Sequence, residues 1–258
     1  MKLGIMQPYF FPYLGYYSLI KQTDEFILFD TVQFIRHGWI ERNRILKPVE
    51  DWQYVAVPLE KKTLSTVIRE LEIRSSEDWK GKLIRQLEHY RKRAPFFRET
   101  LRVVEDSLSI NTTSIVKLNQ NILKKTCAYF DIPLKISIFS EMNLAIDDVT
   151  DPGEWALKIS KALKAEEYFN PTGGMDIFDL AQFDSAGISL RFLGNNLKPY
   201  SQRRQTFEAG LSIIDVMMFN DVESINYLID DTYLVSPKAK LPVPAFKFKS
   251  AIEAQNDN

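Results

Sequence analysis

Short apolar runs alternate with helical patterns along this chain. The first run occupies residues 3–6 and the second occupies residues 26–29, and neither contains a charged side chain. Between them, four apolar residues recur at helical spacing: Leu14, Tyr17, Leu19 and Ile20. Strands that are apolar on both faces and separated by a helix are typical of a parallel sheet covered on both sides. The N-terminal pattern therefore predicts the start of such a sheet.

The stretch from residue 31 to about residue 112 has a different pattern. It opens with polar and basic side chains and continues with an alternating segment at residues 54–58, which predicts a strand. A helix is expected to begin near residues 75–76, because Glu77 and Asp78 would then lie in its first turn and favour the helix dipole. We interpret this stretch as a largely helical insertion after the second strand.

The alternation of strands and helices returns after Ser114. Strands are expected at residues 134–139, 167–170 and 187–193, and helices at residues 211–219 and 222–229. A further helix start is indicated by Asp151, Pro152 and Glu154, which suit the N-cap, first and third positions.

The predicted fold class is α/β, with a doubly wound, mostly parallel, Rossmann-like sheet and a largely helical insertion after its second strand. We expect a single α/β domain over residues 1–235, interrupted by the insertion at about residues 31–112. Residues 236–258 contain recurring Lys and Pro and end in polar residues, which predicts a C-terminal arm or a disordered tail.

The charge balance argues against two classes of partner. The chain has 33 Lys and Arg against 34 Asp and Glu, with a net charge of -1, so bulk attraction to nucleic acid or a membrane surface is not expected. The single cysteine, Cys127, excludes an intrachain disulfide and suits a reducing compartment. No signal peptide and no apolar stretch of about 18 residues is found. These features predict a cytoplasmic protein without an integral membrane segment.

An aromatic, proline-rich segment follows the first predicted strand. Residues 7–16 have the sequence Gln-Pro-Tyr-Phe-Phe-Pro-Tyr-Leu-Gly-Tyr. In a doubly wound sheet this loop borders the ligand crevice, and aromatic rings can stack on a base or a sugar. The predicted substrate-binding residues of this segment are Gln7, Tyr9, Tyr13 and Tyr16. A hydrophobic plug between the sheet and the insertion is an equally simple interpretation.

Four N-terminal segments resemble the opening of the WbqC-like protein family. They are residues 6–16, residues 24–27 (Asp-Glu-Phe-Ile), residues 30–34 (Asp-Thr-Val-Gln-Phe) and residues 38–44 (Gly-Trp-Ile-Glu-Arg-Asn-Arg). Residues 211–220 are similar to the closing motif of the family, so the resemblance covers roughly residues 2–235. It implies a place among the proteins of bacterial surface-polysaccharide and O-antigen biosynthesis.

Residues 13–20, 26–29 and 32–34 are also similar to pantothenate synthetase and related nucleotidyltransferases. Those enzymes carry a His-x-Gly-His motif at the entry of the first helix, where the histidines hold ATP phosphates. In this chain Tyr13 and Tyr16 occupy both histidine positions. Tyrosine can hydrogen-bond a phosphate but carries no positive charge at neutral pH. The resemblance implies a nucleotidyltransferase-like fold, whereas the tyrosines argue against adenylating chemistry.

A basic segment with one tryptophan follows the second predicted strand. Its basic residues are Arg36, His37, Arg42, Arg44 and Lys47. Arginine binds phosphate through two hydrogen bonds, and tryptophan can stack on a sugar or a base. We predict that this segment binds the pyrophosphate of a nucleotide-sugar through Gln33, Trp39, Arg42, Asn43 and Arg44. The alternative is a solvated loop with one packing tryptophan.

Two later loops are further candidates. The sequence Asn-Pro-Thr-Gly-Gly-Met-Asp begins at Asn170, and Gly173 and Gly174 would permit positive φ and close backbone approach to a phosphate. Tyr200 and Arg203 lie beyond the fifth predicted strand, where related nucleotidyltransferases place a basic phosphate loop. A plain turn and an exposed basic loop are the respective alternatives.

Two carboxylates are the predicted catalytic residues. Asp30 ends the second strand, the usual place of an acid that holds a sugar hydroxyl. Asp215, within an apolar helix, is either a paired core acid or a catalytic one. Two histidines and one cysteine provide no zinc spacing, and no residue is assigned to a metal.

The leading hypothesis is an enzyme of bacterial glycan assembly, of transferase or nucleotidyltransferase/ligase type. It would bind a nucleotide-activated or phosphorylated sugar and transfer or ligate a group to it. The sequence leaves the cofactor open, and a nucleoside triphosphate or nucleotide-sugar with Mg²⁺ is the candidate. The predicted partner is thus a small molecule, and binding of nucleic acid is not expected. The alternative is a non-catalytic nucleotide- or sugar-binding or scaffold protein of the polysaccharide machinery. The sequence leaves the reaction, the substrate and the oligomeric state open.

Overall fold

Six strands form the central sheet of the structure, a computed structural model that describes residues 1–63 and 65–235. The strands are β1 (Lys2–Met6), β2 (Glu25–Leu28), β5 (Ile136–Ile138), β6 (Glu167–Pro171), β7 (Ser189–Asn195) and β8 (Thr232–Val235). Their order is β5-β2-β1-β6-β7-β8, and only β8 runs antiparallel to its neighbour. The fold is therefore mixed α/β with a mostly parallel sheet, as the sequence predicts. The predicted tail at residues 236–258 lies outside the described residues.

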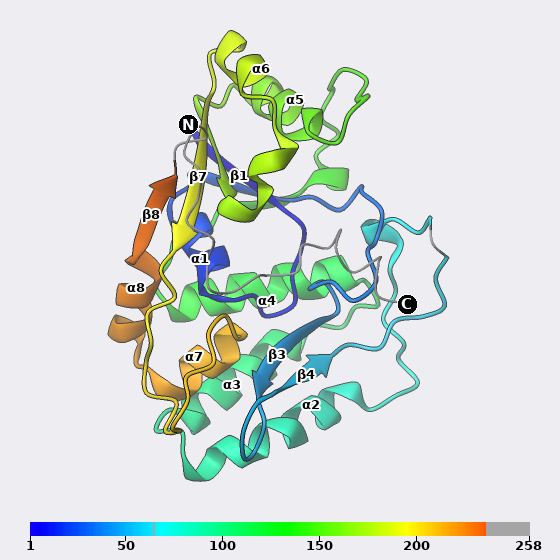
Figure 1. Cartoon of the computed structure of the whole chain (residues 1–258). Helices are drawn as coiled ribbons and strands as arrows, with labels where there is room; N and C mark the ends of the chain where they lie inside the picture. Colours follow the sequence, from blue (N-terminus) through cyan, green and yellow to red (C-terminus); the bar gives the residue numbers. More distant parts are fainter. Residues whose placement is uncertain (64, 236–258) are drawn as a thin grey trace.

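Both faces of the sheet are covered by helices, because its strands are apolar on both sides. In β2, Phe26 and Leu28 pack into one hydrophobic cluster and Ile27 into another. The first cluster contains residues of α1 (Leu14–Lys21), α4 (Ile115–Tyr129), α7 (Ile213–Phe219) and α8 (Val222–Asp230). The second contains residues of α5 (Glu154–Ala162) and α6 (Leu180–Ser185), which lie at the top of Figure 1. This alternation within single strands explains the continuous apolar runs of the sequence.

Between β2 and β5 the chain forms a two-stranded hairpin and several helices. These elements are β3 (Arg42–Leu46), β4 (Trp52–Ala56), the 3-10 helices η1 (Ile68–Glu70) and η2 (Glu88–Lys92), and the helices α2 (Trp79–Leu87) and α3 (Phe97–Leu108). They occupy the lower half of Figure 1, where α3 packs on α4 and α7. Ile45, Val55 and Leu83 belong to the same hydrophobic cluster as the α1 side of the sheet. The hairpin and its helices thus share a core with the sheet.

The structure differs from the sequence-based predictions at the start of α2 and in the basic segment. The helix expected near residues 75–76 begins at Trp79, because Asp78 is its N-cap and accepts a hydrogen bond from the Gly81 N–H at 3.0 Å. Strand β3 lies within the basic segment for which the sequence suggests no strand, and its buried positions, Asn43, Ile45 and Leu46, pack toward the interior. No helix in the described residues is long and apolar enough to cross a membrane.

Candidate functional site

The segment between β1 and α1, residues 7–13, forms a turn that we call the aromatic-proline turn. The rings of Phe10 and Phe11 are fully buried and meet edge to face, with centroids 5.0 Å apart. The Tyr16 hydroxyl, also buried, donates to the Gln7 carbonyl at 2.8 Å, and the Tyr9 ring lies 5.5 Å from that of Tyr16. Burial raises the pKa of Tyr9 to about 12, so its phenol is neutral at physiological pH. The turn is therefore a rigid, uncharged wall.

Side chains from distant segments hold the backbone of this turn. Asn43 Nδ2 donates to the carbonyls of Phe10 and Phe11 at 3.1 and 3.0 Å, and Ser212 Oγ donates to the Phe11 carbonyl at 2.8 Å. The Phe10 N–H in turn donates to the Trp39 carbonyl at 2.8 Å. Hairpin β3–β4, the segment before it and α7 therefore meet at the turn. Phe11 has a φ of 39°, a left-handed conformation that these bonds stabilise.

Asn119 of α4 makes a second connection of the same kind. Its Nδ2 donates to the Pro8 carbonyl at 2.8 Å and to the Ile40 carbonyl at 2.9 Å, and the side chain is fully buried. One amide group thus bridges the aromatic-proline turn and the segment that leads into the hairpin. Because α4 also packs against the sheet, the relative positions of turn and hairpin are set by the core.

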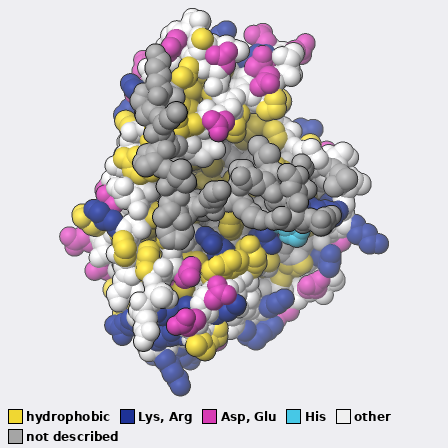
Figure 2. Space-filling model, in the orientation of Figure 1, with side chains coloured by type: hydrophobic (Ala, Val, Ile, Leu, Met, Phe, Trp, Pro, Cys, Tyr) yellow, Lys and Arg dark blue, Asp and Glu magenta, His cyan; other side chains and the backbone are white. Residues whose placement is uncertain are grey.

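The outward face of the hairpin and the segment before it carry a group of aromatic and basic residues that we call the arginine-tryptophan cluster: Trp39, Arg42, Arg44, Trp52 and Tyr54. Arg42 and Arg44 share this face because side chains alternate along a strand, and Tyr54 is paired with Arg44 in β4. The Arg44 guanidinium lies 5.6 Å from the Trp39 ring centroid and 5.1 Å from that of Trp52. Figure 2 shows Lys and Arg side chains over the lower half of the molecule, interspersed with hydrophobic and acidic ones.

The two guanidinium groups differ in their hydrogen bonding. Arg42 stacks on the Tyr54 ring at 4.0 Å and donates to the His37 carbonyl at 2.6 Å and the Gly38 carbonyl at 3.4 Å. Arg44 donates to the Gly210 carbonyl at 3.2 Å, and its Nε is enclosed without a partner in the described part of the chain. Burial lowers the pKa of Arg44 from its usual value.

Neither guanidinium forms an ion pair with a carboxylate of the described residues. Carbonyl oxygens and aromatic faces orient both groups, and Glu208 favours the charged form of Arg44 without forming an ion pair with it. Such an arrangement can accept a phosphate or a carboxylate from a ligand.

Asp215 lies on α7 and is fully buried beneath the hairpin. Its Oδ1 accepts from the Tyr90 hydroxyl at 2.6 Å, and its Oδ2 accepts from the Tyr200 hydroxyl at 2.6 Å and from Gln202 Nε2 at 3.0 Å. Burial raises the pKa of Asp215 to about 6, against the opposing effect of these donors. The Tyr90 hydroxyl also accepts from the Leu46 N–H at 2.8 Å. Asp215 thus connects α7, the loop before it and β3.

Asp30 is similarly enclosed at the end of β2. It is buried, its Oδ1 accepts from the Ser140 N–H at 3.0 Å, and its Oδ2 accepts from the Ser140 hydroxyl at 2.6 Å. The carboxylate therefore ties the end of β2 to the end of β5. Among the described residues no group of three or more His, Cys, Asp or Glu side chains is arranged to hold a metal ion.

Asn170, the penultimate residue of β6, is buried and donates to the Tyr168 hydroxyl at 2.7 Å. After β6 the chain continues as the 3-10 helix η4 (Thr172–Ile177). A Cβ on Gly174 would lie 2.2 Å from Asn170 Oδ1, whereas one on Gly173 would meet open space. Neither glycine has a positive φ, so that expectation for the loop is wrong. Close packing against Asn170 explains the second glycine instead.

A sequence model of the WbqC-like protein family matches residues 7–227, which include every element of the site. This chain belongs to the WbqC-like protein family. Uncharacterized protein Rv1507c of Mycobacterium tuberculosis (strain ATCC 25618 / H37Rv) is 29% identical to it over 230 residues, covering 88% of this chain and 97% of the relative. No solved structure matches the chain.

In this WbqC-like chain the predicted site residues fall into separate groups. The aromatic-proline turn and the arginine-tryptophan cluster are in direct contact. Tyr200 is instead a partner of the buried Asp215, and Arg203 is exposed on the same loop with a φ of 50°. Gln33 is exposed and forms an isolated antiparallel bridge with Val67.

Several residues that build the WbqC-like site are absent from the sequence-based candidates. Trp52 and Tyr54 complete the aromatic face of the hairpin, and Asn119, Tyr90 and Gln202 hold its backbone and Asp215. The alternation of Trp52 and Tyr54 beside a predicted strand could have indicated the first pair. Asn119 and Tyr90 come from remote segments, and no local pattern points to their contacts. Gln202 lies in the candidate loop, between Tyr200 and Arg203.

Proposed function

We propose that this WbqC-like protein is an enzyme of bacterial surface-glycan biosynthesis. In this proposal it binds a nucleotide-activated or phosphorylated sugar and transfers or ligates a group to it. The single observation that carries the proposal is the arginine-tryptophan cluster, in which two oriented guanidinium groups without carboxylate partners lie beside aromatic rings. Phosphate groups and sugar or base rings have the complementary chemistry.

The strand order supports a ligand site at this end of the sheet. The chain moves outward from β1 to β2 and β5 and then returns to the other side of β1 with β6 and β7. We infer a Rossmann-like, doubly wound domain with an insertion at about residues 31–112. In such folds, ligands bind beyond the carboxyl ends of the strands, where the order reverses. Here β1 leads into the aromatic-proline turn, and β6 ends with Asn170 and Pro171 before η4. This part of the argument is an analogy at the level of the fold.

The proposed roles follow from the chemistry of each side chain. Arg42 and Arg44 would hold the phosphate groups, since guanidinium groups bind phosphate oxygens in pairs. Trp39 and Tyr9 would face the sugar or base ring. Asp30 and Asp215 are both enclosed by protein donors, so in this proposal they position the rim of the site, and their catalytic role stays a prediction.

The test is binding of UDP-glucose, CTP and ATP, with and without Mg²⁺, measured by isothermal titration calorimetry. Arg44→Lys keeps the charge but cannot bind a phosphate with two parallel hydrogen bonds, so we expect at least about tenfold weaker binding. Arg98→Lys, at an exposed position of α3, is the matched control and should bind like the wild type. Equal affinity of wild type and Arg44→Lys for every bound nucleotide would contradict the proposed site.

A non-catalytic binding protein is the second candidate function. It is favoured by the enclosure of both Asp30 and Asp215, which leaves neither carboxylate exposed as a general base. Burial also raises the pKa of Tyr13 and Tyr16, the tyrosines at the two histidine positions, so both stay neutral. Release of pyrophosphate or of a nucleoside diphosphate from a bound ligand would support the enzyme. Tight binding without turnover in the presence of acceptor sugars would support the binding protein.

A further inference from the structure

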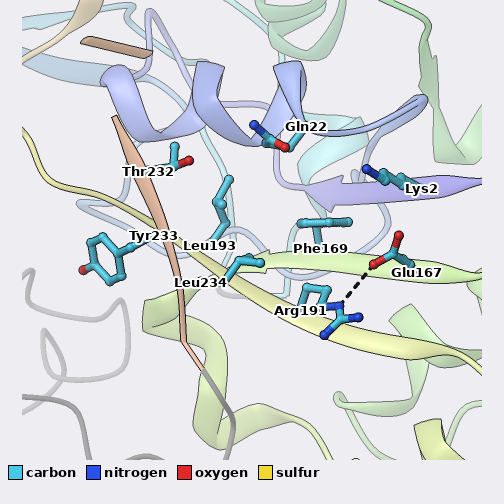
Figure 3. Close-up of a pocket in the computed structure, with 9 residues that line it drawn as sticks. All are labelled: Lys2, Gln22, Glu167, Phe169, Arg191, Leu193, Thr232, Tyr233 and Leu234. Atoms are coloured by element: carbon cyan, nitrogen blue, oxygen red, sulfur yellow. Dashed lines mark hydrogen bonds and ion pairs between the residues drawn. The ribbon is translucent and has the colours of Figure 1, made fainter. Parts of the chain in front are cut away.

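A second hollow lies on the sheet away from the candidate site. It has a volume of about 480 Å³, which suits a small ligand, and it opens between the end of α1 and strand β8 (Figure 3). Lys2 and Glu167, the first residues of β1 and β6, form part of its wall. The aromatic-proline turn leaves the opposite end of β1. The hollow is therefore distinct from the arginine-tryptophan cluster.

The floor of the hollow is apolar. Phe169 and Leu193 are 4% and 7% exposed, and they project from neighbouring strands β6 and β7 on the same face of the sheet. The Lys2 ammonium lies 6.0 Å from the centroid of the Phe169 ring. An apolar floor with a cation at one side suits a ring that carries an anionic group.

The wall of the hollow has an excess of positive charge. Arg191 Nε donates to Glu167 Oε2 at 3.1 Å, an ion pair drawn in Figure 3. This bond orients the guanidinium through Nε and leaves both terminal nitrogens without a partner among the described residues. Lys2 forms no ion pair within that part of the chain. Two cations thus face one carboxylate, which is already engaged.

We propose that this hollow is a second ligand site, which binds a small ring-shaped molecule bearing one carboxylate or phosphate group. The anion lies between the Lys2 ammonium and the terminal nitrogens of Arg191. The ring lies against the exposed Leu234, which is paired with Leu193, above the buried Phe169 and Leu193. A sugar phosphate and a sugar carboxylate share this chemistry.

The test is a titration of ¹⁵N-labelled protein with four separate probes, followed by NMR: glucose 6-phosphate, glucuronate, glucose and inorganic phosphate. We expect at least one of the two charged sugars to shift the amide signals of Lys2, Phe169 and Arg191, and glucose to bind at least about tenfold more weakly. The two charged probes distinguish phosphate from carboxylate as the preferred anion. Glucose binding as tightly as the charged sugars would overturn the proposal, and so would inorganic phosphate binding equally well, because the apolar floor would then contribute nothing.

Matched variants separate this site from the arginine-tryptophan cluster. Lys2→Met is expected to weaken binding of the charged sugar at the hollow about tenfold, because it removes a charge-assisted contact. Lys124→Met, at an exposed position of α4, should leave it unchanged. In Arg44→Lys, the amide signals of Lys2 and Arg191 should still shift when the charged sugar is added. Failure of the proposed function and failure of this second site therefore give different results. An unchanged affinity in Lys2→Met would refute the second site.

Discussion

The buried carboxylate of Asp215 makes a quantitative prediction about the pH dependence of stability. Burial raises its pKa from 3.8 to about 6, so the folded state binds the proton more tightly than the unfolded state. The stability gained from that proton is complete below pH 3.8 and is lost as the pH rises through about 6. A shift of about two pKa units corresponds to roughly 3 kcal/mol at 1.36 kcal/mol per unit. Of this, roughly 1 kcal/mol is lost between pH 5 and pH 7.

The assay compares urea denaturation of the wild type and Asp215→Asn at pH 5 and pH 7. The asparagine does not titrate, so the wild type should gain roughly 1 kcal/mol relative to the variant when the pH falls from 7 to 5. His89, whose pKa burial lowers, titrates in both proteins and cancels in the difference. Asp184→Asn, at an exposed position, is measured in parallel as the control for the substitution of Asp by Asn. A difference for Asp215→Asn that is independent of pH would refute the reasoning.

Three further predictions concern packing and binding. Gly174→Ala should lower the free energy of unfolding by roughly 1–3 kcal/mol, because the added Cβ would lie 2.2 Å from Asn170 Oδ1. Gly173→Ala, whose Cβ would meet open space, should leave the free energy of unfolding nearly unchanged, and urea denaturation compares the two variants. Asn119→Ala should lower the free energy of unfolding by roughly 2–4 kcal/mol, since it leaves two buried carbonyls without a donor. This loss should exceed that of Asn121→Ala, which removes one partly buried hydrogen bond. An equal cost for both variants would contradict the bridging role. The predicted loss of nucleotide affinity in Arg44→Lys, relative to Arg98→Lys, completes the set.

The sheet could be predicted from the sequence because its strands carry a strong local signal. Residues 3–6 and 26–29 are continuous apolar runs, and β1 and β2 lie there, within one residue at their ends. The basic hairpin strand β3 carries no such signal, because only one of its faces is buried and Arg42 and Arg44 occupy the other. The partner strand β4 was expected at residues 54–58 and lies at Trp52–Ala56, two residues earlier. Half-buried strands with long cationic side chains are difficult to recognise from periodicity alone.

The connections of the candidate site could not be predicted, because they join residues far apart in the chain. Asp215 illustrates this point: its sequence context leaves a paired core acid and a catalytic acid open. Its partners, Tyr90 and Tyr200, lie 125 and 15 residues away in the chain. Only the fold brings their hydroxyls to the two carboxylate oxygens. The enclosed geometry favours the paired acid, and catalysis by Asp215 stays a prediction.

The residues that build this site differ from those available to a ligand in how fully their polar groups are hydrogen-bonded to protein partners. Asp30, Asp215 and Asn43 have protein partners that fix their carboxylate or amide groups, and removing them would disturb the scaffold first. Arg44 and Arg42 differ, because carbonyls and aromatic rings orient them and neither forms an ion pair with a carboxylate of the described residues, although Glu208 favours the charged form of Arg44. Keeping a partly buried guanidinium charged costs solvation energy, and a bound anion would offset that cost. Arg44, whose pKa burial lowers and which forms no ion pair in the described residues, is thus the strongest reason to expect a phosphate-bearing ligand at the hairpin.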